Sequence, residues 1–204
     1  MLPDNYEEVL NINHDGVMAY IDIPKINTFL PIYHGTSDEV LNKGAGHLEG
    51  TCLPIGMDGM LSFISAHRGL PSAKLFTDLD LLEVGDTFFI SVLDKKLAYE
   101  VFKIEEIKPE EIKDITNSTT KDIVVLITCT PYGINTHRLL VYGERVEYTK
   151  EEINEVIKEN KPLVSMWVLE YAFAIILGLI VILIIILSYR IYKGYKFKHK
   201  RNVL

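Results

Sequence analysis

Within residues 14–149 the sequence consists mainly of short apolar runs separated by turn-rich loops, and residues 17–23 and 28–32 alternate between apolar and polar positions, which is the pattern of strands. Strands are expected at residues 17–23, 28–32, 60–66, 87–93, 97–107, 123–127 and 139–148, and short helices at 38–42, 73–82 and 109–115. Turn residues at Gly85-Asp86 and Asp94-Lys95-Lys96 indicate tight hairpins between antiparallel strands. Seven or so strands with few helices predict a mainly β fold, either a closed barrel or a sandwich.

The chain changes character after residue 149. Residues 150–165 include apolar positions at helical spacing, with Thr149 as the expected N-cap, and predict a short juxtamembrane helix or linker. Residues 171–189 contain no charged side chain and are dominated by isoleucine and leucine. At about 1.5 Å per residue this run spans roughly 28 Å, close to the hydrocarbon thickness of a bilayer. We therefore expect a transmembrane helix over residues 166–189.

The distribution of charge orients this helix. Residues 190–204 carry six lysines and arginines and no acid, and such basic flanks stay on the cytoplasmic side. Without those six, 15 of the 21 Lys and Arg remain against 28 Asp and Glu, so residues 1–189 have a formal charge of −13. The acidic bulk is expected outside the cell and the basic tail in the cytoplasm. Such an acidic domain also argues against nucleic acid as a partner.

The N-terminal sequence does not resemble an export signal. MLPDNYEEVLNIN has neither a basic region nor an apolar core. Because a domain outside the cell needs such a signal, we expect the chain to be a fragment that lacks its upstream segment. The alternative is that the C-terminal span alone directs insertion.

Cys129 lies where one apolar run ends, and Arg138 lies nine residues later at the start of another. Pro131 and Gly133 supply turn chemistry between the runs, so both side chains can reach the same rim. That geometry suits a site, although a buried, inert thiol and a solvated arginine fit the pattern equally well. Cys52 is expected to be an ordinary buried or loop thiol, and a disulfide between the two cysteines stays open.

A nucleophilic cysteine needs a base, because a free thiol is mostly protonated at neutral pH. His67 follows the strand expected at residues 60–66, so it lies at a strand end, as Cys129 does. The other histidines are weaker candidates: His14, His34, His47, His137 and His199. A zinc site of Cys129, His67 and another histidine is an alternative, but no paired ligand spacing supports it.

Four segments carry a family resemblance. They are AYIDIPKI at residues 19–26, GHLEGT at 46–51, SAHRGLPSAKLFTDL at 65–79 and TCTPYGINTHR at 128–138. Together they closely resemble the class C, pilus-assembling sortases of Gram-positive bacteria over residues 16–148. The resemblance implies a closed eight-stranded sortase β-barrel, here residues 14–149, and places the family's catalytic residues at His67, Cys129 and Arg138. A C-terminal membrane helix is also usual in that class.

The resemblance implies a cysteine transpeptidase without a cofactor or metal. Cys129 would attack the threonine carbonyl of an LPxTG-like sorting signal, His67 would protonate the leaving amine, and Arg138 would stabilise the oxyanion or position the substrate. A pilin lysine would then attack the thioester, so the expected partners are pilin subunits joined by isopeptide bonds. A cell-wall-anchoring sortase, a cysteine hydrolase with the same residues and a non-catalytic membrane-tethered binding module are the alternatives.

Two departures from the class C pattern are visible. The family's Thr-Leu-x-Thr-Cys signature begins here with Val125, a change that a buried strand tolerates. The Asp-Pro-aromatic tripeptide that anchors an N-terminal lid in class C enzymes does not occur in the sequence. Residues 1–13 are therefore expected to be a remnant of the lid region.

Overall fold

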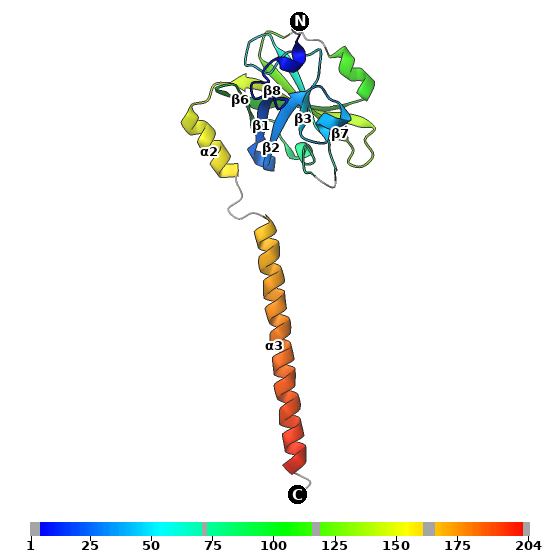
Figure 1. Cartoon of the computed structure of the whole chain (residues 1–204), viewed down its shortest axis with the longest axis vertical. Helices are drawn as coiled ribbons and strands as arrows, with labels where there is room; N and C mark the ends of the chain where they lie inside the picture. The colour runs from blue at the N-terminus through cyan, green and yellow to red at the C-terminus, as the bar shows by residue number, and fades with distance from the viewer. Residues whose placement is uncertain (1–4, 71–72, 116–118, 161–165, 202–204) are drawn as a thin grey trace. The chain divides into compact units, whose positions relative to one another are not determined.

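The computed structural model describes residues 5–70, 73–115, 119–160 and 166–201 (Figure 1). Contacts divide the chain into two compact units, residues 1–161 and 162–204. The first unit contains the strands, and the second contains a long helix, α3 (Met166–Arg201).

Within the described residues, eight strands close into one barrel in the order β1-β2-β3-β4-β7-β8-β6-β5. They are β1 (Val17–Ile23), β2 (Thr28–His34), β3 (Ala45–His47), β4 (Leu61–Ser65), β5 (Thr87–Val92), β6 (Lys95–Ile107), β7 (Ile123–Thr130) and β8 (His137–Val146). Neighbouring strands are antiparallel except in the pairs β2·β3 and β4·β7, which are parallel. The expected closed eight-stranded barrel is confirmed, and a sandwich is excluded because β1 pairs with β5 and closes the sheet.

The strand boundaries depart from the apolar pattern at the rim that carries Cys129. β7 extends beyond the apolar run to Thr130, and β8 already begins at His137. These added residues pair with each other, Cys129 with Arg138 and Thr130 with His137, because backbone pairing continues whatever the polarity of the side chains. β3 was not expected at all, since its three residues are too few to show alternation.

The main core fills the inside of the barrel. Its largest fully buried side chains include Tyr99, Phe88 and Phe76. The rings of Phe88 and Tyr99 stack with centroids 5.5 Å apart, and Gly143 leaves them room because a Cβ there would overlap the Phe88 ring. Close packing at this point rigidifies the sheet from which the rim loops emerge.

A second apolar cluster covers the outer face of β4, β7 and β8. Its buried members are Leu61, Phe63, Val125, Ile127, Leu140 and Tyr142. Residues that alternate with these point into the main core, as the two-residue period of a strand requires. Ile107, the last residue of β6, and Ile115, within the β6–β7 connection, pack on this outer cluster. The connection, which includes η4 (Pro109–Asp114), therefore gives this face of the barrel a second apolar layer.

The short helices agree only in part with the prediction. α1 (Asp38–Leu41) forms where expected, with its first turn capped by Ser37 Oγ, which accepts a hydrogen bond from Val40 N at 3.4 Å. The helix expected at residues 73–82 is reduced to η3 (Leu79–Leu81). The reason is local: Leu75 has a φ of 42°, and Phe76 N donates back to the carbonyl of His67, so the chain closes a loop there.

The N-terminal segment packs on the barrel through η1 (Tyr6–Glu8). Tyr6 is buried, and its hydroxyl lies 2.8 Å from His47 Nδ1 and accepts a hydrogen bond from Gly35 N at 3.0 Å. His34 Nε2 lies 2.7 Å from the carbonyl of Val9. These contacts fix residues 6–9 against β2 and β3.

Helix α2 (Lys150–Asn160) begins with the expected cap. Thr149 Oγ1 accepts from Glu152 N at 3.2 Å, and the Glu152 carboxylate accepts from Thr149 N at 2.7 Å, which completes a capping box. Ile153 is buried against Phe89 and Ala98 of the barrel. The segment predicted as a juxtamembrane helix is therefore helical over residues 150–160 and packs on β5 and β6; residues 161–165 lie outside the described residues.

Helix α3 has the length and composition of a membrane span. Its Tyr171–Tyr189 segment contains 19 residues with a mean hydropathy of 3.0, and none of it is buried within the chain. Large apolar side chains that the protein itself leaves uncovered need an apolar environment. The helix is thus suited to anchor the chain in a membrane.

Candidate active site

Three neighbouring strands bring the candidate residues into one row. Ser65 of β4 is in register with Ile127 of the parallel strand β7. β4 ends at Ser65, but Ala66 N still donates to the carbonyl of Ile127 at 3.1 Å, so His67 follows β4 on the side of β7 that carries Cys129. On the other side of β7, Cys129 pairs directly with Arg138 of β8. The row continues the outer apolar cluster, so the site lies on the outside of the barrel at its rim.

A pocket of about 210 Å³ opens between these side chains. Its lining includes His67, Cys129 and Arg138, with Leu41, Leu48 and Ile112 from three other segments. Each of the three candidate residues is half-buried, which leaves it accessible to a bound molecule. A second pocket of about 470 Å³ shares Leu48 and Ile112 with the first and extends along the β6–β7 connection. The thiol, imidazole and guanidinium therefore surround one pocket with an apolar neighbour.

Two threonines hold the end of β7 that carries the thiol. Thr128 Oγ1 donates to the carbonyl of Ala66 at 2.9 Å, and Thr130 Oγ1 donates to Glu106 Oε1 at 3.1 Å. Both threonines are buried, whereas Cys129 between them faces the opposite side. The backbone around the thiol is thereby tied to the residue before His67 and to β6.

The guanidinium of Arg138 is oriented by its own loop. Nη1 donates to the carbonyls of Asn135 at 3.2 Å and His137 at 3.0 Å. Among the described residues no carboxylate pairs with it. Arg138 thus keeps a positive charge and unused N–H donors beside Cys129, as stabilisation of a developing oxyanion requires.

His67 is held by its backbone and has a free ring. Its carbonyl accepts a hydrogen bond from Phe76 N at 3.0 Å, and no described residue hydrogen-bonds to its imidazole. Both ring nitrogens are therefore available to exchange protons with a thiol or with a substrate amine.

The other barrel histidines have different surroundings. His47 is fully buried between Tyr6 and the carbonyl of Cys52, which lies 2.8 Å from its Nε2, and burial lowers the pKa of His47. His34 contacts the backbone of the N-terminal segment. His137 pairs with Thr130, one position out of phase with Arg138, so it points to the opposite face. His67 is the histidine that shares the pocket with Cys129.

The structure also decides between the alternatives for the cysteines. Cys52 and Cys129 are both free, so the disulfide that the sequence left open does not form. Within the described residues, no group of three or more His, Cys, Asp or Glu side chains has the arrangement of a metal site. The barrel geometry therefore offers no support for the zinc alternative.

Comparison with known proteins identifies the class. Residues 21–146 match the sortase domain family, and the chain belongs to that family. Among solved structures, it is similar to sortase C1 from Streptococcus agalactiae, with 52% identity, a TM-score of 0.68, and coverage of 71% of this chain and 75% of that chain. Sortase C-1 from Streptococcus pneumoniae matches at 49% identity with a TM-score of 0.64, covering 66% of this chain and 69% of that one. The resemblance to class C sortases is confirmed.

A curated relative is more distant. Sortase D of Bacillus subtilis (strain 168) is 32% identical over 129 residues, which is 62% of this chain and 62% of that protein. The chain thus spans less than two thirds of the length of this relative.

Several residues around the site were not predicted from sequence. Thr128 could have been suspected from its place next to Cys129 in the signature segment. Leu41, Leu48 and Ile112 gave no signal, because they come from three distant segments that only the closed barrel brings to one pocket. Arg68 was also missed, although it directly follows His67.

Proposed function

We propose that this protein is a cysteine transpeptidase that cleaves an LPxTG-like sorting signal and joins pilin subunits through lysine isopeptide bonds. The observation that carries the proposal is the meeting of Cys129, His67 and Arg138 around one pocket, on a barrel about half identical to sortases C1. The three residues are proposed as nucleophile, general acid and base, and oxyanion partner.

The first half-reaction forms a thioester. The Cys129 sulfur, as thiolate, attacks the carbonyl carbon of the signal's threonine, and Arg138 donates hydrogen bonds to the oxygen as it becomes negative. His67, as imidazolium, gives its proton to the glycine nitrogen, and the threonine–glycine bond breaks. The neighbouring 470 Å³ pocket, lined by Leu48, Phe63 and Ile112, suits the apolar residues of an extended peptide.

The second half-reaction restores the thiolate. A neutral lysine amine of another pilin attacks the thioester carbon, a C–N bond forms and the C–S bond breaks. His67, neutral after the first step, accepts the proton that the amine loses, and is ready for the next cycle. The product is an isopeptide bond between two subunits.

The proposed topology follows from α3 and the charges. We infer that the Tyr171–Tyr189 segment spans the cell membrane, with the barrel outside and residues 190–204 inside. Pilins are exported proteins, so an outward barrel meets its substrates there. Thiol labelling of Cys129 in intact cells by a membrane-impermeant reagent tests this orientation.

The test of the activity uses the full chain in detergent with a fluorogenic LPxTG peptide and a lysine-bearing pilin domain. Mass spectrometry should find the acyl fragment on Cys129 and, after the pilin is added, a lysine isopeptide. A thioester that yields only hydrolysed acid would favour the cysteine hydrolase. Transfer to a cell-wall amine in preference to lysine would favour a cell-wall-anchoring sortase, and no adduct at all would favour a binding module.

A further inference from the structure

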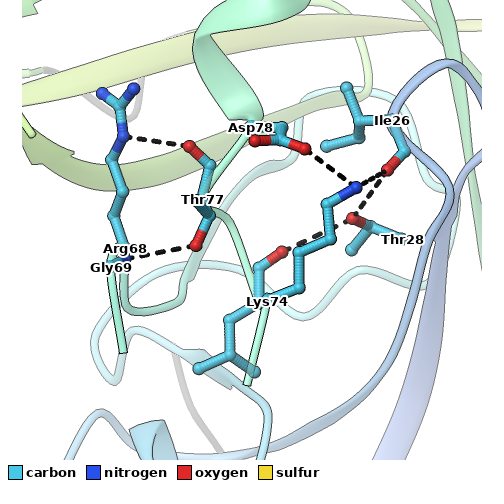
Figure 2. A network of polar contacts seen from close by, with 8 residues as sticks. Ile26, Thr28, Arg68, Gly69, Lys74, Thr77 and Asp78 are labelled. Carbon is cyan, nitrogen blue, oxygen red and sulfur yellow. Dashed lines mark hydrogen bonds and ion pairs between the residues drawn. The ribbon is translucent and has the colours of Figure 1, made fainter. Parts of the chain in front are cut away.

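The loop that carries His67 is closed by hydrogen bonds between its two ends. Phe76 N donates to the carbonyl of His67 at 3.0 Å, and Gly69 N donates to Thr77 Oγ1 at 3.2 Å. Figure 2 shows the contacts around Thr77, together with those that Lys74 makes farther along the same loop. The position of His67 therefore depends on the segment of residues 76–77 returning beside residues 67–69.

Arg68 joins this closure to other parts of the chain. Its Nε donates to the carbonyl of Thr77 at 3.0 Å (Figure 2), and its Nη2 forms an ion pair with Asp80. Its guanidinium also lies over the Tyr132 ring, 5.7 Å from the centroid. Only 8% of the side chain is exposed, so the charge is largely buried and depends on these three partners.

Tyr132 belongs to the loop between Cys129 and Arg138. Its ring also lies against Gly69, where an added Cβ would come within 3.0 Å of Cε2. Residues 68–69 and Tyr132 therefore form a direct contact between the loop of the imidazole and the loop of the thiol. Cys129 and Arg138 are already fixed to each other by strand pairing, whereas His67 follows the end of β4.

We propose that Arg68 is a positioning residue that keeps the imidazole of His67 aligned with the thiol of Cys129. It does so by lying over the Tyr132 ring as a cation while its Nε and Nη2 hold Thr77 and Asp80. The proposal rests on the proposed function, since it concerns the thiol–imidazole pair. A guanidinium is required because its planar face can stack while its edge donates in two directions, which a lysine ammonium cannot do.

The experiment compares Arg68→Lys and Arg68→Met in the full chain in detergent, in a Cys52→Ser background so that only one thiol reacts. Peptide cleavage gives kcat and KM, and iodoacetamide alkylation of Cys129 is followed against pH. We expect kcat to fall about 10- to 100-fold in both variants, with KM changed less than about threefold, because misalignment by about 1 Å has costs of this order. The alkylation profile should shift to higher pH, because the imidazolium no longer supports the thiolate.

Variants of Lys74 and Tyr132 serve as controls. They separate the positioning of His67 by Arg68 from the loss of any positive charge in this loop and from a general loosening of the loop. Lys74 belongs to the same loop as Arg68. Lys74→Met removes its ion pair with Asp78 and its hydrogen bond to the carbonyl of Ile26, and should leave the alkylation profile unchanged. Tyr132→Phe, which keeps the ring, should behave as wild type, whereas Tyr132→Ala should shift the profile as the Arg68 variants do. Tyr132 is 59% exposed, so its variant tests the contact even if Arg68→Met fails to fold.

The outcomes that overturn the proposal are specific. An Arg68→Lys variant with the wild-type profile would show that charge alone is used. A Lys74→Met profile shifted as far as that of Arg68→Met would show loosening of the whole loop, and a wild-type profile for Tyr132→Ala would show that the stacking is irrelevant. None of these outcomes would contradict the proposed function. The proposed function would fail on a different result, which is cleavage that persists in Cys129→Ala.

Discussion

The two ends of strand β7 carry polar side chains that differ in their access to solvent. At its end, Cys129 is half-buried and opens onto a pocket. Just before its start, Asp122 is only 2% exposed; Tyr99 donates a hydrogen bond to its Oδ2 at 3.0 Å, and within the described part of the chain Oδ1 has no partner. Burial raises the pKa of Asp122 to about 6.

The difference shows what makes a polar group a candidate site. Asp122 has a raised pKa because it is buried, and its carboxylate accepts a hydrogen bond from Tyr99 in the barrel core. Cys129 has space beside it, and His67 and Arg138 line the same pocket. A shifted pKa in a buried side chain is therefore explained by the cost of burial. A side chain of a reactive type that lines a pocket is the better candidate for catalysis.

The largest effect should come from the Cys129 end. Cys129→Ala removes the proposed nucleophile, so peptide cleavage and isopeptide formation should fall by more than about 10³-fold, with the fold retained. Cleavage is measured with the fluorogenic peptide and folding by circular dichroism. Activity near that of the wild type would remove Cys129 from the mechanism.

Arg138 should come second. Arg138→Lys keeps a charge but loses the planar fork, and loss of one oxyanion donor typically lowers kcat by about 10²–10³-fold. The measurement is kcat and KM separately, with Arg145→Lys at the far end of β8 as the matched control. A variant with nearly wild-type kcat would mean that charge suffices without directed hydrogen bonds.

The Asp122 end should affect stability instead of turnover. Because its folded pKa of about 6 exceeds the ordinary value of 3.8, the folded state binds this proton more tightly than the unfolded state. Stability should therefore fall as pH rises from about 4 to 6, by roughly 2–4 kcal/mol from this group, and remain lower above that range.

Asp122→Asn cannot ionise and should lack this dependence. Urea unfolding of both proteins in detergent at pH 4 and pH 7 gives the comparison, and the difference in their free energies of unfolding should change by that amount. An unchanged difference would show that Asp122 is not desolvated, and a large loss of kcat in Asp122→Asn would contradict the separation of the two ends.

The smallest effect should come from the other cysteine. The contact of Cys52 with His47 is made by the Cys52 backbone carbonyl, which lies 2.8 Å from His47 Nε2 and which any residue at this position would supply. Cys52→Ser should change kcat less than about twofold and the free energy of unfolding by less than about 1 kcal/mol. Cleavage and urea unfolding test this, and a loss as large as that of Arg138→Lys would give Cys52 a role in turnover.

The sequence predicted the parts of the fold that alternate clearly. Residues 17–23 and 97–107 form strands where they were expected, and the paired cysteine and arginine at the rim were expected from the turn between two apolar runs. β3 was not predictable, since three residues carry no period.

The limits of the prediction at the site are also physical. Whether a histidine is free or fully bonded depends on residues brought close only by folding, as the contact of Tyr6 with His47 across 41 positions illustrates. The same holds for Arg68, whose partners Asp80 and Tyr132 come from different loops. Family resemblance selected His67, where local pattern alone gave only a weak preference.

The parallel pairing of β4 with β7 has a consequence for the order in which the proposed site assembles. Thr128 and Ala66 meet across 62 positions of sequence, so the region beside the thiol forms only after a long loop has closed. Contacts of this range slow folding, and antiparallel pairing with β8 can precede them because β7 and β8 are adjacent along the chain. We expect Cys129 and Arg138 to pair before His67 comes to lie beside them, so that the proposed site is completed by the long-range contact of β4 with β7 and not by the hairpin of β7 and β8.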